Sequence, residues 1–268
     1  MPTTLGYDIA MDTFELHRGS APLLISVPHN GTEVPDEIAE RLTDDARRVP
    51  DTDWHVARLY AFARELGASM IAPRHSRYVI DLNRPEDDVS LYPGQNTTGL
   101  CPVVRFTGDP VYREGMAPDE AEIRSRVDRY WRPYHAALAA EIARLKAEHG
   151  RLVLWEAHSI KGELPFLFEG RLPDLNLGTA GGTSCSPELQ ARLEAVLAGQ
   201  RDYDFIVNGR FKGGYITRHY GDPASGVQAV QLEMSQRIYM DEESFAYDEA
   251  KSARTQAVLR NLLEAVLG

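Results

Sequence analysis

The chain has 268 residues, 43 % of them apolar, and its 29 Lys and Arg set against 40 Asp and Glu leave a formal net charge of −11. A chain of this length can bury a core large enough to fold without disulfides or a structural metal. The acidic balance argues against a nucleic acid or an anionic membrane as partner, because both need a basic face on the protein.

The two cysteines, Cys101 and Cys185, are too few for a disulfide framework or a cysteine-rich zinc site, so we expect two free thiols in a reducing compartment. Residues 1–19 lack a basic stretch followed by an apolar core, and no apolar run is long enough to span a membrane. We therefore expect a cytoplasmic protein with no membrane partner, acting as a monomer or small homo-oligomer. Without an internal repeat or linker, residues 1–268 are expected to form a single domain.

Short apolar runs and one helical pattern occupy the first part of the chain. A helix is expected over residues 53–66, and Gly67 ends it. Strands are predicted on either side of this helix, at residues 22–27, 68–72 and 77–82.

The second part of the chain continues the alternation. A long helix is expected over residues 119–149, with a kink or break at Pro133. Ser186 and Pro187 are typical of an N-cap and a first helical position, so a helix should run to Ala198, and a last helix carries the apolar stripe from Val258 to Leu267. Strands are predicted at 152–157, 204–208 and 227–233. This order is typical of an α/β fold with a mixed, largely parallel sheet.

Two segments, 85–118 and 164–184, show neither pattern. The first is rich in Gly, Pro, Asp and Asn, and the second ends in GTAGGTS. Long irregular segments in a compact domain are more often functional loops than accidents, so we expect both to form walls of an active site.

Two histidines stand directly after predicted strands: His29 follows LLISVP and His158 follows LVLWEA. Ligands collect at the carboxyl ends of strands in α/β sheets, so these side chains can converge. A catalytic zinc site takes three ligands from His, Asp or Glu and leaves one position for water. Asp53 can supply the carboxylate, or it can simply cap the helix that it opens.

Further charged residues stand at strand ends. Glu233 ends an apolar strand, where it can act as a base towards a metal-bound water or be a hydrogen-bonded glutamate. Arg77 begins the predicted strand 77–82, and Asn83 with Arg84 ends it. Arginines can bind carboxylates or stabilise an oxyanion, or they can form surface ion pairs of little value.

The segment GRFKGGYITRHYG gathers basic residues around Gly213 and Gly214. A glycine pair lets backbone approach a ligand closely, or it forms a flexible turn. Both interpretations stay open for its basic residues, Arg210, Lys212, Arg218 and His219.

Together these pieces resemble the N-formylglutamate amidohydrolase family over nearly the whole chain, because the stretches SVPHNGTEVP, DTDWHVARLY, SRYVIDLNR, AHS, FKGGYITRHYG and VQLEMS occur in that family's order. The family is distantly similar to zinc carboxypeptidases and aspartoacylases, which implies a three-layer, phosphorylase/hydrolase-like sandwich with helices flanking the sheet. The resemblance implies hydrolysis of N-formyl-L-glutamate to L-glutamate and formate, the last step of a histidine-degradation route. It also implies one divalent metal ion, with zinc favoured over cobalt or iron.

The resemblance assigns roles to the candidate residues. It implies that His29, Asp53 and His158 hold the metal, that Glu233 is the general base and that Arg77 polarises the carbonyl. The substrate is a small dianion, so one carboxylate would bind Asn83 and Arg84 and the other Lys212 or Arg218. Because the net charge is −11, the cations among these residues must gather into a local positive pocket near the metal.

The metal ligands of the carboxypeptidase pattern include a Glu three residues after the first His, where this chain has Thr32 and then Glu33. Asp53 is favoured over Glu33, because it belongs to the family's next recurring stretch while Glu33 lies in a turn. Glu156 stands two residues before His158, where the family often has Asp, and either acid could orient that histidine.

Two other functions use the same residues. One is a deacylase or peptidase that acts on another N-acyl amino acid with the same metal site. The other is a non-catalytic ligand-binding protein on this fold, against which the intact His29, His158 and Glu233 argue.

Overall fold

The computed structural model describes residues 7–10, 12–90, 94 and 96–268. Its strands form one eight-stranded sheet in the order β1-β2-β4-β3-β5-β8-β6-β7. The strands are β1 (Tyr7–Ala10), β2 (Phe14–Arg18), β3 (Leu23–Ser26), β4 (Ser69–Pro73), β5 (Leu152–Ile160), β6 (Leu175–Gly178), β7 (Phe205–Val207) and β8 (Val227–Ser235). The central strands β4, β3, β5 and β8 are parallel, whereas β1, β2 and the pair β6–β8 bring antiparallel pairings. The expected mixed sheet is confirmed.

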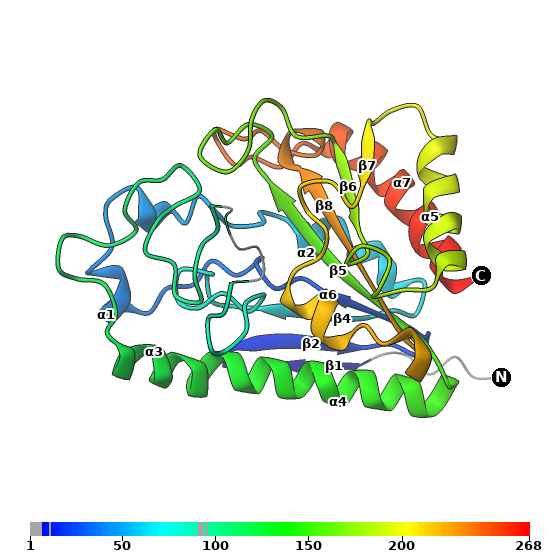
Figure 1. Ribbon diagram of the computed structural model, residues 1–268, viewed down its shortest axis with the longest axis horizontal. Coiled ribbons are helices and arrows are strands. Elements are labelled where there is room, and N and C mark those ends of the chain that lie inside the picture. The colour runs from blue at the N-terminus through cyan, green and yellow to red at the C-terminus, as the bar shows by residue number, and fades with distance from the viewer. Residues whose placement is uncertain (1–6, 11, 91–93, 95) are drawn as a thin grey trace.

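Helices cover both faces of the sheet (Figure 1). The α-helices are α1 (Asp36–Ala39), α2 (Val56–Leu59), α3 (Glu120–Arg126), α4 (Arg132–His149), α5 (Pro187–Gly199), α6 (Tyr215–Tyr220) and α7 (Glu249–Leu267). Single turns of other helix types lie at Ala46–Arg48, Ala61–Arg64, Val127–Trp131, Pro223–Ser225 and Gln236–Ile238. One apolar core joins the sheet to α2, α5 and α7, and the other joins it to α4 and α6. The flanking helices expected for an α/β sandwich are therefore present.

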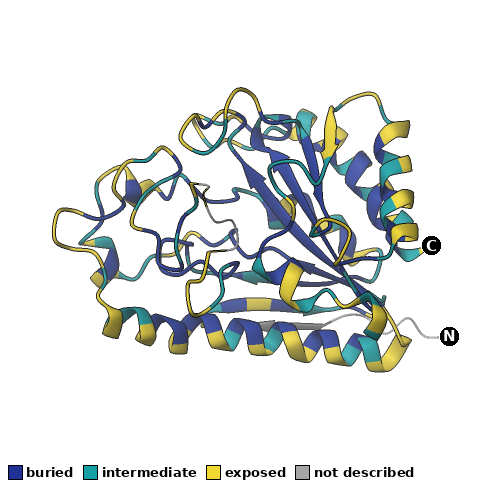
Figure 2. Ribbon diagram, viewed as in Figure 1, coloured by how far each residue is buried: buried dark blue, intermediate teal, exposed yellow. Residues whose placement is uncertain are grey.

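Alternation along the central strands divides the side chains between these two cores. On β3, Leu23 and Ile25 belong to the core under α5 and α7, and Leu24 belongs to the core under α4. The same period of two applies to β5, where Leu154 and Trp155 face opposite ways. Both faces are covered, so the strands are dark blue throughout the middle of the molecule in Figure 2.

Three predicted elements differ from the structure. Residues 77–82 form turns instead of a strand, because the Asp81 carboxylate accepts a hydrogen bond from the main chain of Asn83 at 2.8 Å and bends the backbone. The helix expected over 53–66 shrinks to α2 and one 3₁₀ turn, and the residue before α2, His55, has a left-handed φ of 63°. The strand β6 lies inside the segment 164–184, which was expected to be irregular.

The other predicted helices are confirmed. The helix over 119–149 is interrupted ahead of Pro133 by the π-helical turn Val127–Trp131, and α4 then begins with that proline in its first turn. Ser186 caps α5 by accepting a hydrogen bond from the main chain of Leu189. Cys101 and Cys185 are buried free thiols. Within the described part of the chain, no helix has the length and apolar character needed to cross a bilayer.

Candidate active site

The site begins with the register of two neighbouring parallel strands. Glu156 of β5 pairs with Gln231 of β8, and His158 pairs with Glu233. These four residues continue the alternation of Leu154 and so lie on the face covered by α4 and α6. The sheet thus presents two carboxylates, one imidazole and one amide side by side at the carboxyl ends of its central strands.

Three side chains converge next to this row. The Oδ2 atom of Asp53 lies 2.9 Å from Nδ1 of His158 and 3.6 Å from Nδ1 of His29. All three residues are buried, and one potential ligand atom from each lies within 4.8 Å of the other two. Asp53 is held between the strands, because its main-chain N–H donates to His29 and its carboxylate accepts from the N–H of Ser159. It does not cap α2, whose N-cap position is His55.

The far nitrogen of each histidine contacts another buried carboxylate. Nε2 of His29 lies 2.7 Å from Asp81, and Nε2 of His158 lies 2.7 Å from Glu156. Glu156 is fixed in turn by the N–H of Thr217 at the start of α6. Carboxylates on the outer nitrogens of paired histidines orient the inner nitrogens towards a metal ion. The donor set His29, Asp53 and His158 therefore fits one divalent ion of the kind that prefers nitrogen and oxygen ligands.

Glu33 lies elsewhere. Its carboxylate is about half exposed and pairs with Arg74 at 3.3 Å. The cluster of potential ligands found among the described residues holds Asp53 and excludes Glu33. The geometry thus favours Asp53 as the carboxylate ligand, and its role remains a proposal.

The charges of the cluster act strongly on one another. Burial would lower the pKa of His158, but Glu156 and Asp53 raise it well above its ordinary value. Burial would raise the pKa of Asp53, and the neighbouring His29 and His158 hold it below the usual range. These interactions favour the ionised form of the Asp53 carboxylate beside the His158 imidazole.

Glu233 differs from the other acids of the site. It is buried, and within the described residues no group hydrogen-bonds to its carboxylate. Burial raises the pKa of Glu233 to about 8. The positive charges of His158 and Arg77 act to lower this pKa, and the negative charges of Asp53 and Glu156 act to raise it. A buried acid without partners and with a pKa near neutrality is suited to taking and returning a proton.

Arg77 lines the same pocket as Glu233. Its guanidinium donates to Asp81 at 2.5 Å and lies 4.6 Å from the centre of the Phe106 ring. Its Nε atom is buried and makes no hydrogen bond within the described part of the chain. Arg77 thus keeps one buried donor that no described group of the protein uses.

Asn83 and Arg84 also line this pocket. The Asn83 amide nitrogen lies 3.1 Å from Nε2 of His158, and its oxygen accepts from the N–H of Ile216 in α6. This close packing needs Gly214, because a Cβ atom there would lie 2.2 Å from the Asn83 amide nitrogen. Gly214 thus allows the backbone to approach Asn83 closely, whereas Gly213 adopts a positive φ of 120°.

Two predicted substrate-binding residues, Lys212 and Arg218, are not among the described residues that line the pocket. The side chain of Lys212 is exposed, because its backbone turns to accept from the N–H of Ala180. Arg218 lies on the exposed side of α6 and donates back to the carbonyl of Gly213. Arg210 reaches the pocket in their place.

The pocket contains about 650 Å³ of space between atoms, part of it open to solvent. Both irregular segments contribute walls, as predicted, although positions 91–93 and 95 of the first lie outside the described residues. Its lining includes His29, Asp53, Arg77, Asn83, Arg84, Asn96, Thr97, Thr98, Phe106, His158, Ser159, Ile160, Leu167, Arg210, Phe211, Gly214, Gln231 and Glu233.

Sequence reasoning missed two residues that support the site. Asp81, to which the sequence analysis assigned no role in the site, is buried between His29 and Arg77. Gln231 accepts from the N–H of Gly214 at 2.7 Å and so holds the turn before α6. Asp81 stands two residues before Asn83, and Gln231 stands two residues before Glu233. In a predicted strand, residues two apart share a face, and this spacing was the signal that could have found them.

Known proteins resemble the chain in sequence and in fold. The family model for N-formylglutamate amidohydrolase matches residues 21–240. An N-formylglutamate deformylase of Pseudomonas putida is 52 % identical over 94 % of both chains, and one of Pseudomonas aeruginosa is 54 % identical over 96 % of both. The crystal structure of an N-formylglutamate amidohydrolase from Ralstonia eutropha JMP134 superposes with a TM-score of 0.81 at 26 % identity, covering 95 % of this chain and 98 % of that one.

Proposed function

The chain belongs to the N-formylglutamate amidohydrolase family, and from this premise we propose that it hydrolyses N-formyl-L-glutamate to L-glutamate and formate on a divalent metal ion. The observation that supports this mechanism is the convergence of His29, Asp53 and His158 with the buried Glu233 in one pocket. This activity would complete a histidine-degradation route in the cytoplasm.

His29, Asp53 and His158 would hold the ion, with Asp81 and Glu156 orienting the two imidazoles. Zinc is favoured because two histidines and one carboxylate form a typical catalytic zinc set, and cobalt or iron could use the same ligands. When bound, such an ion lowers the pKa of a coordinated water and polarises a carbonyl oxygen.

Glu233 would act first as the general base and then as the general acid of the reaction. One of its carboxylate oxygens would accept a proton from the attacking water and then deliver it to the nitrogen of the departing glutamate. The raised pKa of Glu233, about 8, suits both transfers, because it places the acid and base forms within reach of neutral pH.

Arg77 would donate to the oxygen that becomes negative when water adds to the formyl carbon. Its unused, buried Nε–H is available for this, and Asp81 and Phe106 fix the guanidinium in place. A fixed donor of this kind typically contributes about 2.7 to 4 kcal/mol to transition-state stabilisation. Asn83 and Arg84, next to the metal ligands, would bind a carboxylate of the substrate.

The test is formate and glutamate release by the purified protein, before and after treatment with a chelator. We expect hydrolysis of N-formyl-L-glutamate, its loss on metal removal and its return when zinc is added. The panel includes N-acetyl-L-glutamate, N-succinyl-L-glutamate and N-formyl-L-aspartate. Full activity in the chelated protein would contradict the metal mechanism, and a preference for N-acetyl-L-glutamate would contradict the substrate.

A further inference from the structure

N-formyl-L-glutamate carries two carboxylates, so a selective site needs a second cation beyond the one beside the metal ligands. Among the described residues, the cations lining the pocket are Arg77, Arg84 and Arg210. Arg77 is bound to Asp81 inside the protein. Resting on the proposed function, we infer that Arg210 binds the side-chain carboxylate of the substrate and sets the preference for glutamate over uncharged residues.

The placement of Arg84 assigns the first carboxylate. Arg84 directly follows Asn83, whose amide nitrogen lies 3.1 Å from the metal-ligand candidate His158. In the substrate, the α-carboxylate is one carbon from the amide nitrogen that is released, and the side-chain carboxylate is three carbons from it. Arg84, which stands beside the residue that contacts His158, therefore matches the α-carboxylate.

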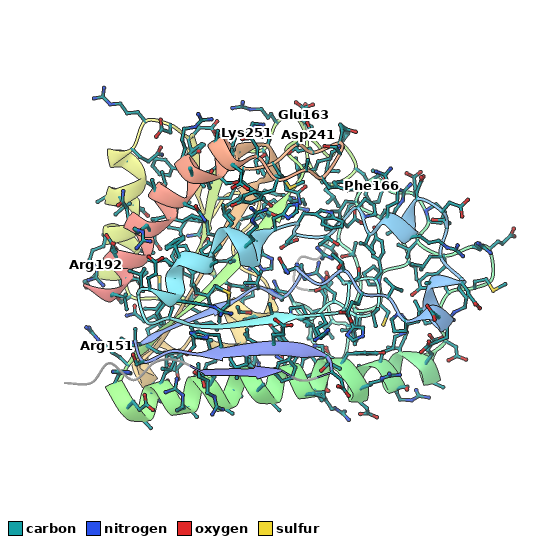
Figure 3. All side chains as sticks on the ribbon, turned by 180° about the vertical axis from the view of Figure 1, so that it is seen from behind. Arg151, Glu163, Phe166, Arg192, Asp241 and Lys251 are labelled. Carbon is teal, nitrogen blue, oxygen red and sulfur yellow. The ribbon has the colours of Figure 1, made fainter. Side chains whose placement is uncertain are left out.

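Arg210 lies where the two irregular walls of the pocket meet. Its Nε atom donates to the carbonyl of Leu167 at 3.3 Å, and its Nη2 atom donates to the carbonyl of Asn96 at 3.1 Å. The Asn96 side chain in turn donates to the carbonyl of Phe166, so the two walls contact each other at this point. Figure 3 shows Phe166 on the side of the molecule where the loops gather, away from Arg151 and Arg192.

These contacts hold the guanidinium in position before a ligand arrives. The main-chain carbonyls of Leu167 and Asn96 fix the direction of the guanidinium, and the ring of Phe211 lies 5.6 Å from it. A preordered arginine loses less side-chain entropy on binding and can grip a carboxylate through two parallel bonds. Arg210 is thus positioned to bind the side-chain carboxylate of the substrate, which lies farther from the released nitrogen than the α-carboxylate does.

The experiment compares N-formyl-L-glutamate with its two single amides, N-formyl-L-glutamine and N-formyl-L-isoglutamine. We expect the wild type to lose activity on either amide. The variant Arg210→Gln should lose about 30- to 100-fold in kcat/KM on N-formyl-L-glutamate and less than about threefold on N-formyl-L-glutamine, because the latter lacks the anion that Arg210 binds. The variant should still discriminate against N-formyl-L-isoglutamine. Arg210→Lys, which keeps the charge, should recover part of the loss.

The matched comparison is Arg84→Gln, which should show the reverse pattern and become insensitive to amidation of the α-carboxylate. Arg192→Gln changes the net charge equally on the exposed side of α5 and should leave all three rates as they are. If Arg210→Gln lost the same factor in kcat/KM on N-formyl-L-glutamate and on N-formyl-L-glutamine, the role of Arg210 would be overturned. A wild type inactive on all three substrates would instead refute the proposed function.

Discussion

The Glu233 side chain is buried and lines the pocket, and its carboxylate has no hydrogen-bond partner among the described residues, which leaves it available to accept a proton. We expect Glu233→Gln to lower kcat by about 10²- to 10⁴-fold, since the amide keeps the shape and cannot accept the proton. Metal content, measured by elemental analysis, should not change, because Glu233 lies outside the proposed ligand set. An unchanged kcat would remove Glu233 as the base.

Asp81 joins His29 to Arg77 through its two carboxylate oxygens. Replacing it with asparagine should weaken metal affinity about 10- to 100-fold, because the imidazole loses the group that orients it. Competition with a fluorescent chelator measures this affinity. The control is Asp44→Asn, at an exposed position, which should bind metal like the wild type. Equal affinities in the two variants would show that the contact with His29 does not support metal binding.

Residue types and their places after strands were enough to nominate the polar cluster. His29, His158 and Glu233 follow or end apolar runs, and parallel strands bring such ends to one edge. The cation for the second carboxylate could not be chosen in this way. Arg210 and Lys212 are both basic and two positions apart, and the path of the backbone between β7 and α6 decides which reaches the pocket.

At the scale of elements, α5 packs against the sheet, and none of its residues is among the described residues that line the pocket. Ser186→Ala removes the cap that accepts from the N–H of Leu189, and this should lower the free energy of unfolding by about 1 kcal/mol. Urea unfolding measures the loss, and Ser186→Asp should restore most of it. The kcat/KM for N-formyl-L-glutamate should stay unchanged. A large loss of activity would mean that α5 influences the site.

Periodicity predicted elements well where packing and pattern agree, as in α5 and the strands β5 and β8. It failed where side-chain contacts outweigh the pattern. Residues 77–82 contain an apolar run typical of a buried strand, yet their buried ion pair and the turn at Asp81 hold the backbone in the site. The strand β6 has few apolar residues of its own, and pairing with β8 and β7 creates it.

At the scale of the whole molecule, the net charge of −11 coexists with three arginines in one pocket. The overall charge governs long-range encounters with polymers and membranes, while a small ligand responds to the charges within a Debye length of about 8 Å. An acidic protein can therefore bind a small dianion, provided its cations are fixed locally. Arg77 and Arg84 line the pocket as the prediction requires, and Arg210, which it did not assign to the substrate, lines the pocket with them.

The stability of the whole fold should also depend on pH through His135 of α4. This side chain is buried, with Nε2 bonded to the carbonyl of Leu82 and Nδ1 to the hydroxyl of Tyr220. Burial lowers its pKa to about 4, from an ordinary value of 6.5. Since the unfolded chain binds the proton more readily, the stabilising effect of the neutral ring is complete above about pH 6.5 and is lost as the pH falls to about 4.

This loss amounts to about 3 kcal/mol, at 1.36 kcal/mol for each unit of pKa difference. Urea unfolding at several pH values between 7.5 and 4 gives the free energy of unfolding as a function of pH, and the loss is the difference in the slope of this function between the wild type and His135→Gln. The glutamine can still donate a hydrogen bond to the carbonyl of Leu82 but does not titrate. Other titrating groups, including the metal ligands, are shared and cancel in this difference. His149→Gln, at the end of α4, serves as the control and should keep the wild-type slope. If His135→Gln kept it as well, protonation of the buried ring would not be what destabilises the fold in acid.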